Sequence, residues 1–475
     1  MTKENHMKLI NELEKHIGNV NKERLIVIAG HPGSGKTILA SSICLAFVYQ
    51  GLKCLYVSFQ EPKEKFLDET AGVGLELEKY EKIGLFRFLK LPVVTDGSSL
   101  NQIINIINKE VANYSPRVVA IDSISSMLKT LSADIEIRGY LQNYFYELQK
   151  MVKGPVILIA ELPFGMETIE LGNIEFVSDV FLILKHRITR GLLERFMEIR
   201  KVRGHELTVA EIPFSIRSKT GISLLSPPIL SEISEVEEFV EMPCEILRSN
   251  IPQIHKSTLI YYEYPAKFRP WVPSICIALL GLHAYNTLKP ILFITYKYPR
   301  NVVQLAFKHV IERSTGCKEC ADLIVSKLII EPINPYAYSL TELNALENEL
   351  VDKFDPGMII THDVGILMNS TKNIEDYMHL LQNQIFYFKR KGIMMARLAS
   401  RITPYVSKLN KAISDLVMEV KCTNECLDYD IYIWTRFNDP ILLKSNELRE
   451  CIKEATYKVV NIMKSKHSSR LDQRG

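Results

Sequence analysis

The fold of this chain is decided by one stretch of sequence, Gly30-His31-Pro32-Gly33-Ser34-Gly35-Lys36-Thr37. The stretch matches the pattern G-x-x-x-x-G-K-[ST] of a phosphate-binding loop. An apolar run at residues 25–29 precedes it and predicts a buried strand, and an apolar run at residues 38–47 follows it and predicts a helix. Glycines allow backbone N–H groups to surround a phosphate, and the N-terminus of a helix attracts negative charge. The sequence therefore predicts a binding site for a nucleoside triphosphate.

Three side chains are expected to act on the phosphates and on Mg²⁺. Lys36 should reach the β- and γ-phosphates, and the Thr37 hydroxyl should complete the coordination of Mg²⁺. Asp122 ends an apolar strand predicted at residues 117–122. It is expected to hold Mg²⁺ through the water shell of the ion or through a hydrogen bond to Thr37. The alternative for Asp122 is the N-cap of the segment that follows.

The residues after the loop predict a parallel α/β sheet. Further unbroken apolar strands are expected at residues 52–59 and 156–161, with helical stretches between the strands. Ligands of such sheets bind at the carboxyl ends of the strands, where the phosphate loop, Glu61, Asp122 and Glu161 all fall. Glu61 is the candidate for polarising the attacking water, because hydrolysis needs a carboxylate near the γ-phosphate. The alternative for Glu61 is a solvated charge at a strand end.

The length and composition indicate a chain with more than one domain. At 475 residues, the chain exceeds what one hydrophobic core usually supports. The formal net charge of +3 is too small to favour nucleic acid as a partner. The longest apolar stretch, near residues 272–282, is too short to cross a bilayer, and the first residues carry no signal-peptide pattern. We expect a cytoplasmic protein without a membrane partner.

The nine cysteines are scattered along the chain and do not resemble the disulfide framework of a secreted protein. Two pairs have close spacing, Cys317 with Cys320 and Cys422 with Cys426. Together they could supply four thiolates to zinc. Each pair could also form a local disulfide or remain as buried thiols, and the sequence does not decide between these alternatives.

Four stretches, taken in order, resemble the KaiC-like ATPases of the RecA superfamily. They are the phosphate loop, residues 56–61, residues 118–125 and the segment 175–204, which ends in a K-x-R-G sequence. The phosphate loop alone indicates only an NTPase of the P-loop class. The K-x-R-G ending narrows the resemblance to the KaiC-like proteins, and the resemblance extends over about residues 8–225.

The resemblance implies a RecA-like core that binds ATP between neighbouring subunits of a homo-oligomeric ring, usually a hexamer. By position, Lys201 and Arg203 would reach the γ-phosphate of ATP on the adjacent subunit and stabilise the negative charge of the transition state. The alternative is a solvated basic edge hairpin at residues 195–203. The family commonly has two adjacent glutamates where this chain has Gln60 and Glu61. Hydrolysis is therefore expected to be slow, with Glu61 as the sole base.

The second half of the chain resembles a damaged copy of the first half, displaced by about 240 residues. No identical run is long, and the order of the corresponding stretches supports the repeat. These stretches are residues 257–265, 288–296, 355–363, 391–396 and 415–418. The fold class expected is α/β, with two tandem RecA-like domains that each contain a mainly parallel sheet flanked by helices.

The second copy has lost the residues that bind a nucleotide. Residues 263–270 replace the phosphate loop, and they contain no glycine that would let the backbone curl around a phosphate. The position of Asp122 aligns with His362, and Asp363, one residue further, is expected to point to the other face of the strand. Residues 296–298 also lack the hydrolytic carboxylate. We expect that this domain does not bind ATP tightly and serves assembly or the docking of a protein partner.

The predicted organisation has three parts: an ATPase domain at residues 1–228, a degenerate domain at residues 229–457, and a basic, mobile tail at residues 458–475. The function expected is a slowly hydrolysing ring ATPase that acts as a regulatory switch. One alternative is a DNA-binding recombination mediator of the RecA type, although the net charge does not favour it. A second alternative is an ATP-binding scaffold with negligible turnover, which Gln60 suggests.

Overall fold

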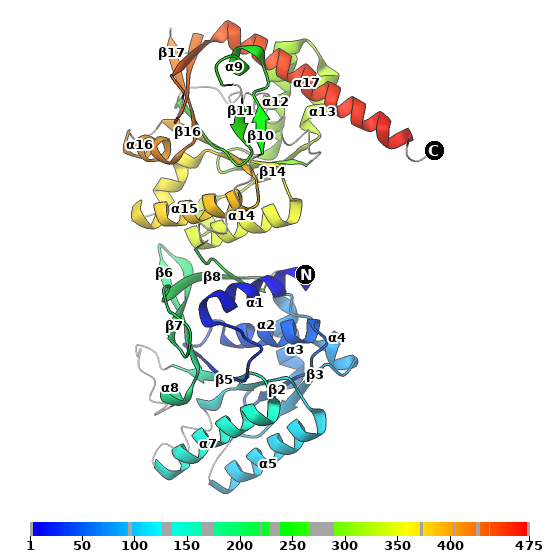
Figure 1. The fold of residues 1–475 in the computed structure, drawn as a ribbon, viewed down its shortest axis with the longest axis vertical. Coiled ribbons are helices and arrows are strands. Elements are labelled where there is room, and N and C mark those ends of the chain that lie inside the picture. The colour runs from blue at the N-terminus through cyan, green and yellow to red at the C-terminus, as the bar shows by residue number, and fades with distance from the viewer. Residues whose placement is uncertain are drawn as a thin grey trace. The chain divides into compact units, whose positions relative to one another are not determined.

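The computed structural model describes residues 3–93, 97–125, 135–162, 174–218, 221–227, 238–251, 253–266, 289–370, 374–401, 404–423, 428–436 and 438–472. The chain divides into two compact units, Met1–Ser226 and Pro227–Gly475 (Figure 1). Each unit contains one large sheet with helices packed on it, and each is described by itself.

The first unit is built on a nine-stranded sheet in the order β3-β2-β4-β5-β1-β6-β7-β8-β9. The strands β1 to β6 pair in parallel, whereas β6 to β9 form antiparallel hairpins. The strand bounds are β1 Leu25–Gly30, β2 Cys54–Ser58, β3 Phe86–Lys90, β4 Val118–Asp122, β5 Val156–Glu161, β6 Val180–Thr189, β7 Leu192–Val202, β8 Glu211–Arg217 and β9 Gly221–Leu224.

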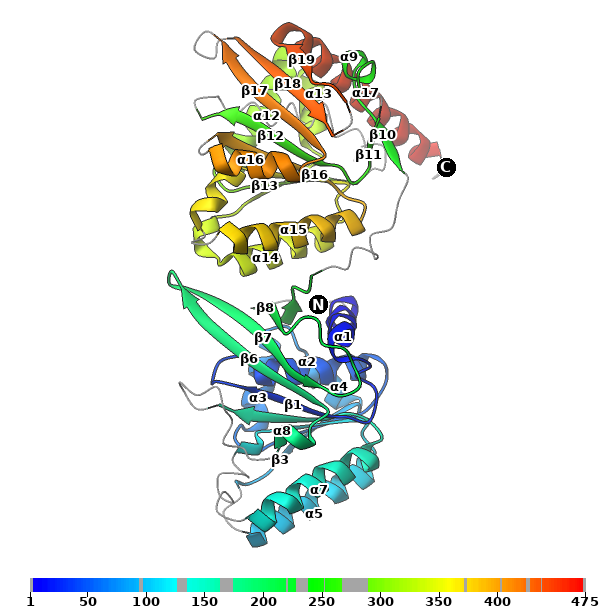
Figure 2. The same cartoon turned by 60° about the vertical axis from the view of Figure 1, so that its left-hand side comes forward.

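Helices cover both faces of this sheet, which explains why its central strands are apolar without alternation. Apolar residues of α1, α2, α3 and α4 form the core on one face, and those of α5 and α7 form the core on the other face (Figure 2). The helix bounds are α1 Lys3–Ile17, α2 Lys36–Tyr49, α3 Lys63–Gly72, α4 Leu77–Lys82, α5 Gly97–Tyr114, α7 Ile135–Val152 and α8 Ile174–Val177.

The second unit repeats the strand order of the first. Its eight-stranded sheet has the order β14-β13-β15-β16-β12-β17-β18-β19, which matches β3-β2-β4-β5-β1-β6-β7-β8 strand by strand. The strand bounds are β12 Leu259–Pro265, β13 Ile291–Thr295, β14 Leu328–Pro332, β15 Met358–His362, β16 Met394–Arg401, β17 Leu416–Thr423, β18 Asp428–Thr435 and β19 Ile441–Lys444. A separate pair, β10 Phe239–Glu241 and β11 Gln253–His255, precedes them.

The second sheet is also covered on both faces. Residues of α9, α12, α13 and α17 pack on one face, and residues of α14 and α15 pack on the other. The helix bounds are α9 Glu245–Arg248, α12 Arg300–Thr315, α13 Lys318–Val325, α14 Leu340–Phe354, α15 Ile374–Arg390, α16 Pro404–Ile413 and α17 Ser445–Asp472, with the 3-10 turns η2 Pro335–Ala337 and η3 Val364–Ser370.

The same hydrogen-bond pattern occurs in both sheets and shows that Leu25 and Asp179 of the first unit correspond to Leu259 and Asp415 of the second. In the first unit, the Leu25 backbone N–H donates to Asp179 Oδ2 at 2.9 Å. In the second unit, the Leu259 backbone N–H donates to Asp415 Oδ2 at 2.8 Å. Each of these aspartates also donates its own N–H to the carbonyl of the same leucine, at 2.9 Å in both units. The expected fold class, two tandem RecA-like α/β domains, is therefore confirmed.

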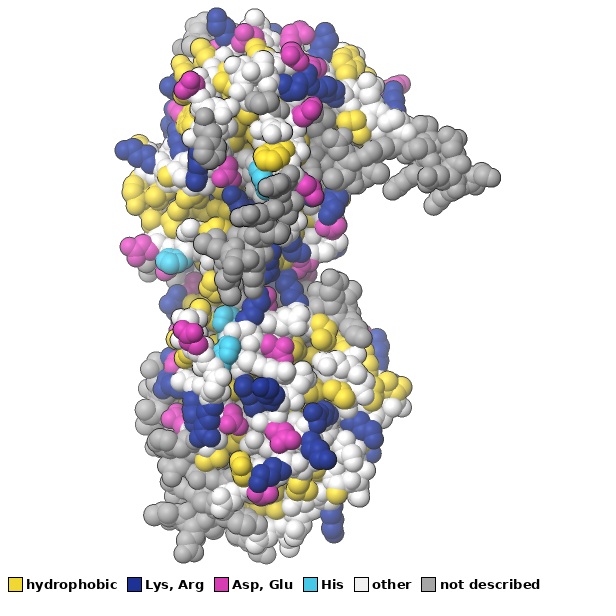
Figure 3. All heavy atoms as spheres, in the orientation of Figure 1, with side chains coloured by type: hydrophobic (Ala, Val, Ile, Leu, Met, Phe, Trp, Pro, Cys, Tyr) yellow, Lys and Arg dark blue, Asp and Glu magenta, His cyan; other side chains and the backbone are white. Residues whose placement is uncertain are grey.

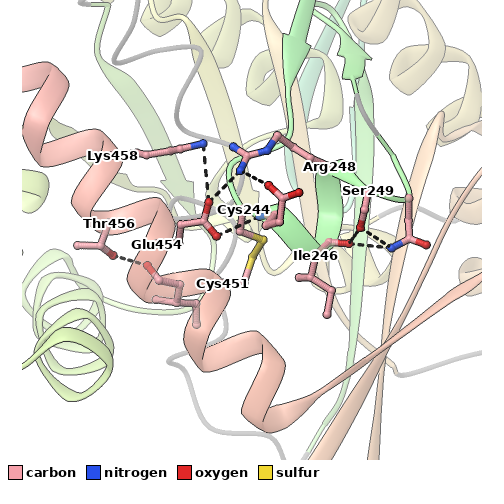
Figure 4. The surroundings of a disulfide bond; sticks show 11 residues. Cys244, Ile246, Arg248, Ser249, Cys451, Glu454, Thr456 and Lys458 are labelled. Carbon is pink, nitrogen blue, oxygen red and sulfur yellow. Dashed lines mark hydrogen bonds and ion pairs between the residues drawn. A yellow bond between two sulfur atoms is a disulfide. The ribbon is translucent and has the colours of Figure 1, made fainter.

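The tail expected at residues 458–475 falls on α17, which continues to Asp472. Val459, Val460 and Met463 are buried in the core of the second unit. These apolar residues have helical spacing, but lysines stand on either side of them. The apolar face of the helix was therefore missed in the sequence. The start of α17 is also tied to α9 by the disulfide Cys244–Cys451 (Figure 4).

Within the described residues, no helix combines the length and the apolar character that a bilayer-crossing segment requires. The same part of the chain contains no group of three His, Cys, Asp or Glu residues that could hold a metal ion. Cys317 is bonded to Cys320, and Cys422 is also disulfide-bonded, so these cysteines are not the zinc thiolates considered above. Cys426 lies outside the described residues.

Candidate nucleotide-binding site

The phosphate loop joins β1 directly to α2, because Gly30 ends the strand and Lys36 begins the helix. A Cβ atom at Gly30 would lie 2.5 Å from the backbone oxygen of Leu184, so only glycine fits there. Gly35 caps α2 with a φ of 101°, which is in the left-handed region that favours glycine. His31, Pro32, Gly33 and Ser34 complete the loop between the two elements. The tight turn therefore places the first backbone N–H groups of α2 at the carboxyl end of β1.

Two buried polar groups of the loop are placed to receive phosphate oxygens. Lys36 is 8% exposed, and its Nζ donates to the carbonyl oxygen of His31 at 2.9 Å. Burial lowers the pKa of Lys36, while the carboxylates of Glu161 and Asp122 act in the opposite direction. The Ser34 hydroxyl is fully buried and has no hydrogen-bond partner among the described residues. An anion in the loop would give the Ser34 hydroxyl the partner that a buried polar atom requires and would offer Lys36 a charged acceptor in place of the carbonyl oxygen.

Thr37 and Asp122 meet as the sequence predicts. Asp122 Oδ2 accepts hydrogen bonds from Thr37 Oγ1 and from the Tyr56 hydroxyl, each at 2.8 Å. Burial raises the pKa of Asp122, and the hydrogen bonds from Tyr56 and Thr37 oppose this effect. Oxygen ligands are the ones that Mg²⁺ prefers, so the Thr37 hydroxyl and the Asp122 carboxylate would hold the ion or its water shell here. The residues present fit that group.

The two candidate carboxylates lie in different surroundings. The Glu61 side chain is 32% exposed, and its Oε1 lies 3.4 Å from Lys65 Nζ. Glu161 Oε1 accepts a hydrogen bond from Gln60 Nε2 at 3.5 Å. Glu161, but not Glu61, is among the charges that act on both Lys36 and Asp122. The electrostatics of the loop thus involve Glu161 at least as directly as Glu61.

Lys201 and Arg203 lie away from the phosphate loop of their own chain. Lys201 Nζ donates to the backbone oxygen of Glu175 at 2.6 Å, and burial lowers its pKa. Arg203 is 56% exposed, and its guanidinium lies 3.7 Å from Asp179. Because Asp179 bonds the backbone of Leu25 at the start of β1, both basic residues lie beside the end of the sheet opposite the loop.

Two polar contributors to the site were missed in the sequence. Tyr56 lies on β2 within an apolar run, and its hydroxyl supports the carboxylate of Asp122. The Ser125 hydroxyl accepts a hydrogen bond from the backbone N–H of Glu161 at 2.7 Å and so fixes the end of β5. The hydroxyl of Tyr56 in an otherwise apolar strand was the available signal. Its partner depends on the pairing of β2 with β4, which a single sequence does not reveal.

In the second unit, His362 occupies the position that Asp122 has in the first unit, as the pairing of corresponding strands shows. Ser58 pairs with Asp122 in the first sheet, and Thr295 pairs with His362 in the second. Counted from the equivalent leucines of β1 and β12, Tyr264 takes the place of Gly30. A large aromatic side chain therefore stands at the position where the first unit has none.

Tyr264 fills this place with buried contacts. Its hydroxyl lies 2.7 Å from His362 Nε2 and 3.4 Å from Asp363 Oδ2, and its ring stacks on the His362 ring. Asp363 pairs with Lys297 at 3.2 Å and accepts from the backbone N–H of Ser400 at 2.9 Å. The expectation that Asp363 points to the opposite face from His362 is wrong, since both contact Tyr264. β15 ends at His362, so strand alternation does not extend to Asp363.

The rest of the replacement loop is only partly described, since Lys267, Phe268, Arg269 and Pro270 lie outside the described residues. Glu263 is buried in the preceding strand and pairs with Lys411 at 2.8 Å and with Arg401 at 3.1 Å. These side-chain hydrogen bonds and charges lower the pKa of Glu263 against the effect of burial. The basic groups near this strand are therefore already paired with a carboxylate of the same chain.

Comparison with known proteins finds a similarity over the first unit. Residues 8–228 match the family model described as "ATPase: KaiC". The chain is 26% identical over 215 residues to "Circadian clock protein KaiC3" of Synechocystis sp., with 44% of this chain and 43% of the relative covered. It is 25% identical over 231 residues to "Circadian clock oscillator protein KaiC" of Thermostichus vulcanus, with 46% and 44% covered. The chain therefore spans less than half the length of these relatives.

The family match covers the residues whose geometry is described above, from the phosphate loop through Asp122 to Arg203. The second unit lies outside the match. Its likeness to the first unit is in the order of its strands. Over its first unit, this chain is similar to the KaiC ATPases.

Proposed function

We propose that the chain is a slowly hydrolysing, Mg²⁺-dependent ATPase that forms a ring and acts as a regulatory switch. ATP binds in the first unit at the interface between subunits, and the second unit serves assembly or docks a protein partner. The observation that supports this most directly is the group of Lys36, Thr37 and Asp122 at the phosphate loop. The first position of this loop, Gly30, has room only for glycine. The name of the relatives, circadian clock proteins, agrees with a switch rather than a metabolic enzyme.

Each residue of the loop has a defined task in this proposal. The backbone N–H groups of the loop and the N-terminus of α2 bind the phosphates. Lys36 exchanges the carbonyl oxygen of His31 for the β- and γ-phosphate oxygens. Mg²⁺, held through Thr37 and Asp122, would neutralise the charge that develops on the phosphates. Tyr56 keeps the carboxylate of Asp122 oriented, because its hydroxyl bonds the same oxygen as Thr37.

The position of Lys201 and Arg203 supports a site shared between subunits. Both lie beside the end of the sheet opposite their own loop, where they do not reach its phosphates. Arg203 is more than half exposed, so its guanidinium is accessible to a neighbour. A cation supplied by the adjacent subunit would stabilise the transition state and couple hydrolysis to ring assembly.

Slow turnover is proposed from the carboxylates near the loop. Gln60 cannot accept a proton, and Glu61 Oε1 lies 3.4 Å from Lys65 Nζ. Glu161 accepts a hydrogen bond from Gln60, so the two side chains hold one another beside the loop. Because Gln60 stands in place of a carboxylate, Glu61 is the sole base expected beside β2.

The second unit is proposed to hold no ATP. Tyr264, His362 and Asp363 fill the place where the first unit has Gly30 and Asp122. Asp363 is buried, and its pair with Lys297 satisfies its charge without a ligand.

ATP binding and phosphate release test the proposal in the full-length protein. Lys36→Ala should abolish ATP binding. Lys201→Ala should retain binding and lose most of the turnover, because its charge acts only in the neighbour's transition state. Arg200→Ala is the matched control, since Arg200 is the adjacent basic residue of β7 and pairs with Glu198 at 2.6 Å. Equal turnover of Lys201→Ala and Arg200→Ala would contradict a shared site.

Native mass spectrometry with a nonhydrolysable ATP analogue tests the ring. We expect a hexamer that requires the analogue, and a monomer under all conditions would contradict the proposal. Filter binding of single-stranded DNA across a salt series tests the recombination alternative. On the face seen in Figure 3, acidic and basic side chains are interspersed in both units rather than gathered in one basic patch. This distribution does not favour DNA binding.

A further inference from the structure

The second unit carries a pair of cysteines in an arrangement that the nucleotide site does not use. Cys317 and Cys320 form a disulfide at the start of α13, with Cys317 as the N-cap residue of that helix. The Cys317 sulfur accepts a hydrogen bond from the backbone N–H of Cys320 at 3.1 Å. We propose that this disulfide is a thiol–disulfide exchange site, at which an external thiolate attacks Cys317. The proposal is independent of the ATPase function.

The two sulfurs differ in accessibility, which sets the direction of attack. Cys317 is half-buried and is flanked by the exposed residues Gly316, Lys318 and Glu319. Cys320 is only 6% exposed and packs with the core of the second unit. An incoming thiolate can therefore reach the sulfur of Cys317, and Cys320 is the leaving group that remains inside.

The start of α13 stabilises the form of Cys317 that the reaction releases. A thiolate at a helix N-terminus is favoured by the unpaired N–H groups and by the helix dipole. The Cys320 N–H already points at the Cys317 sulfur, and the Cys317 N–H is held by the Thr315 hydroxyl at 3.1 Å. The cap geometry is thus present before the disulfide is broken.

The exchange proceeds in two balanced steps. A thiolate of the reductant attacks the Cys317 sulfur, which forms a mixed disulfide and breaks the bond to Cys320, and the Cys320 thiolate takes up a proton. A second thiolate of the reductant then attacks the reductant's own sulfur in the mixed disulfide and releases Cys317. The protein disulfide gains two electrons, the reductant leaves as a disulfide, and its two thiol protons end on the cysteines or in solvent. The co-reactant is a dithiol or a pair of monothiols.

The disulfide between Cys244 and Cys451 provides a matched control in the same unit. Both of its residues are buried, at 0% and 2% exposed. The carboxylate of Glu454 accepts the backbone N–H of Glu245 at 3.0 Å beside this bond (Figure 4). Burial of both cysteines keeps the reagent away from this bond. This disulfide should therefore resist exchange under conditions that reduce the bond between Cys317 and Cys320.

The first test uses the wild-type, full-length protein. It is incubated with increasing dithiothreitol, free thiols are blocked with iodoacetamide, and peptides are mapped by mass spectrometry. We expect Cys317 and Cys320 to be labelled while Cys244 and Cys451 remain bonded and the tryptophan fluorescence of the folded protein is unchanged. Labelling of Cys244 and Cys451 first, or labelling of Cys317 only after unfolding, would overturn the proposal.

The second test separates the two sulfurs. Cys320→Ser leaves Cys317 as a single thiol, which should react with Ellman's reagent about tenfold or more faster than Cys320 does in Cys317→Ser. Both variants should react at equal rates in denaturant, because the difference arises from the fold. Equal rates in the native proteins would contradict the assigned direction of attack.

Glutathione and a thioredoxin-type protein dithiol, offered separately to the wild-type protein, distinguish the source of the thiolate. Reduction by either one supports the exchange site and identifies its reductant. Failure of both, while dithiothreitol also fails below unfolding, would show that the disulfide is a static crosslink.

Discussion

At the scale of single residues, the first unit contains two glutamates that could polarise water. The sequence favoured Glu61 because hydrolysis needs a carboxylate near the γ-phosphate and Glu61 follows the second strand at that edge of the sheet. In the structure, beside the larger effect of burial, the charge of Glu161 acts to raise the pKa values of Lys36 and Asp122. Glu61 lies beside Lys65 instead. The two roles can be separated by neutral substitutions that preserve shape.

We expect Glu61→Gln to lower phosphate release by about 10²-fold or more if Glu61 is the general base, with ATP binding retained. Glu161→Gln should instead change the dissociation constant for ATP, because the charge of Glu161 acts on the pKa of Lys36. Both variants are compared by binding and by single-turnover phosphate release. The reverse pattern, with turnover lost in Glu161→Gln only, would move the base to Glu161.

His362 gives the second unit a pH dependence of its own. Burial lowers the pKa of His362 from an ordinary value of 6.5 to about 4. Between these values the unfolded chain binds a proton that the folded unit excludes, so the free energy of unfolding decreases as the pH falls from 6.5 to 4. The loss amounts to about 3 kcal/mol at most.

The measurement is urea unfolding from pH 7 downward, followed by tryptophan fluorescence. Both tryptophans of the chain, Trp271 and Trp434, belong to the second unit, so the signal reports on that unit alone. His362→Gln should flatten the pH dependence above the range in which Asp363, with its lowered pKa, takes up a proton. His379→Gln, at an exposed position of α15, is the control. An unchanged slope in His362→Gln would refute the assignment.

At the scale of elements, sequence reasoning succeeded where the pattern is local. The apolar runs that became β1, β4 and β5 are unbroken because each strand is buried on both faces. It failed where the pattern depends on distant partners. The hydrogen bond from Tyr56 to Asp122 requires the pairing of two strands, and the disulfide between Cys244 and Cys451 joins residues that are 207 apart.

The site shows the same division. The phosphate loop could be predicted in full, because a glycine, a lysine and a hydroxyl at fixed spacing are a local requirement. The balance between Glu61 and Glu161 could not, because it depends on how the ends of β2 and β5 approach Lys36. The tandem fold could be predicted from the order of the repeated stretches, although the second copy shares few residues with the first.

The helix α17 supplies a prediction at this scale. Val459→Ala should destabilise the second unit by about 2 kcal/mol, because it removes two buried methyl groups from the core. Asn461→Ala, at an exposed position of the same helix, should change the stability by less than about 0.5 kcal/mol. Tryptophan fluorescence during urea unfolding measures both. Equal effects would indicate that the helix end is not packed.

At the scale of the whole molecule, two sheets of the same strand order differ in the side chains at the carboxyl ends of their corresponding strands. Among the described residues of the first unit, the Ser34 hydroxyl has no hydrogen-bond partner, and Lys36 donates to a carbonyl oxygen that phosphate can replace. The second unit satisfies the equivalent region with Tyr264, His362 and the pair of Lys297 and Asp363. Ligand binding should therefore stabilise one unit and not the other.

Calorimetry of the full chain tests this asymmetry. Mg·ATP at 100 times its dissociation constant should stabilise the first unit by about 2.7 kcal/mol and raise its transition temperature. The transition followed by tryptophan fluorescence, which reports on the second unit, should not move. Lys36→Ala should remove the shift of the first transition. A shift of the fluorescence transition with Mg·ATP would contradict an empty second unit.

The bond between Cys244 and Cys451 has a mechanical consequence. It closes a loop of 207 residues that contains all eight strands of the second sheet. When the two ends of this unit are pulled apart in optical tweezers, the force passes through the sulfur atoms, and the residues between them carry no tension. The oxidised unit should then show almost no gain in contour length on rupture, and only reduction of that bond would release its long extension.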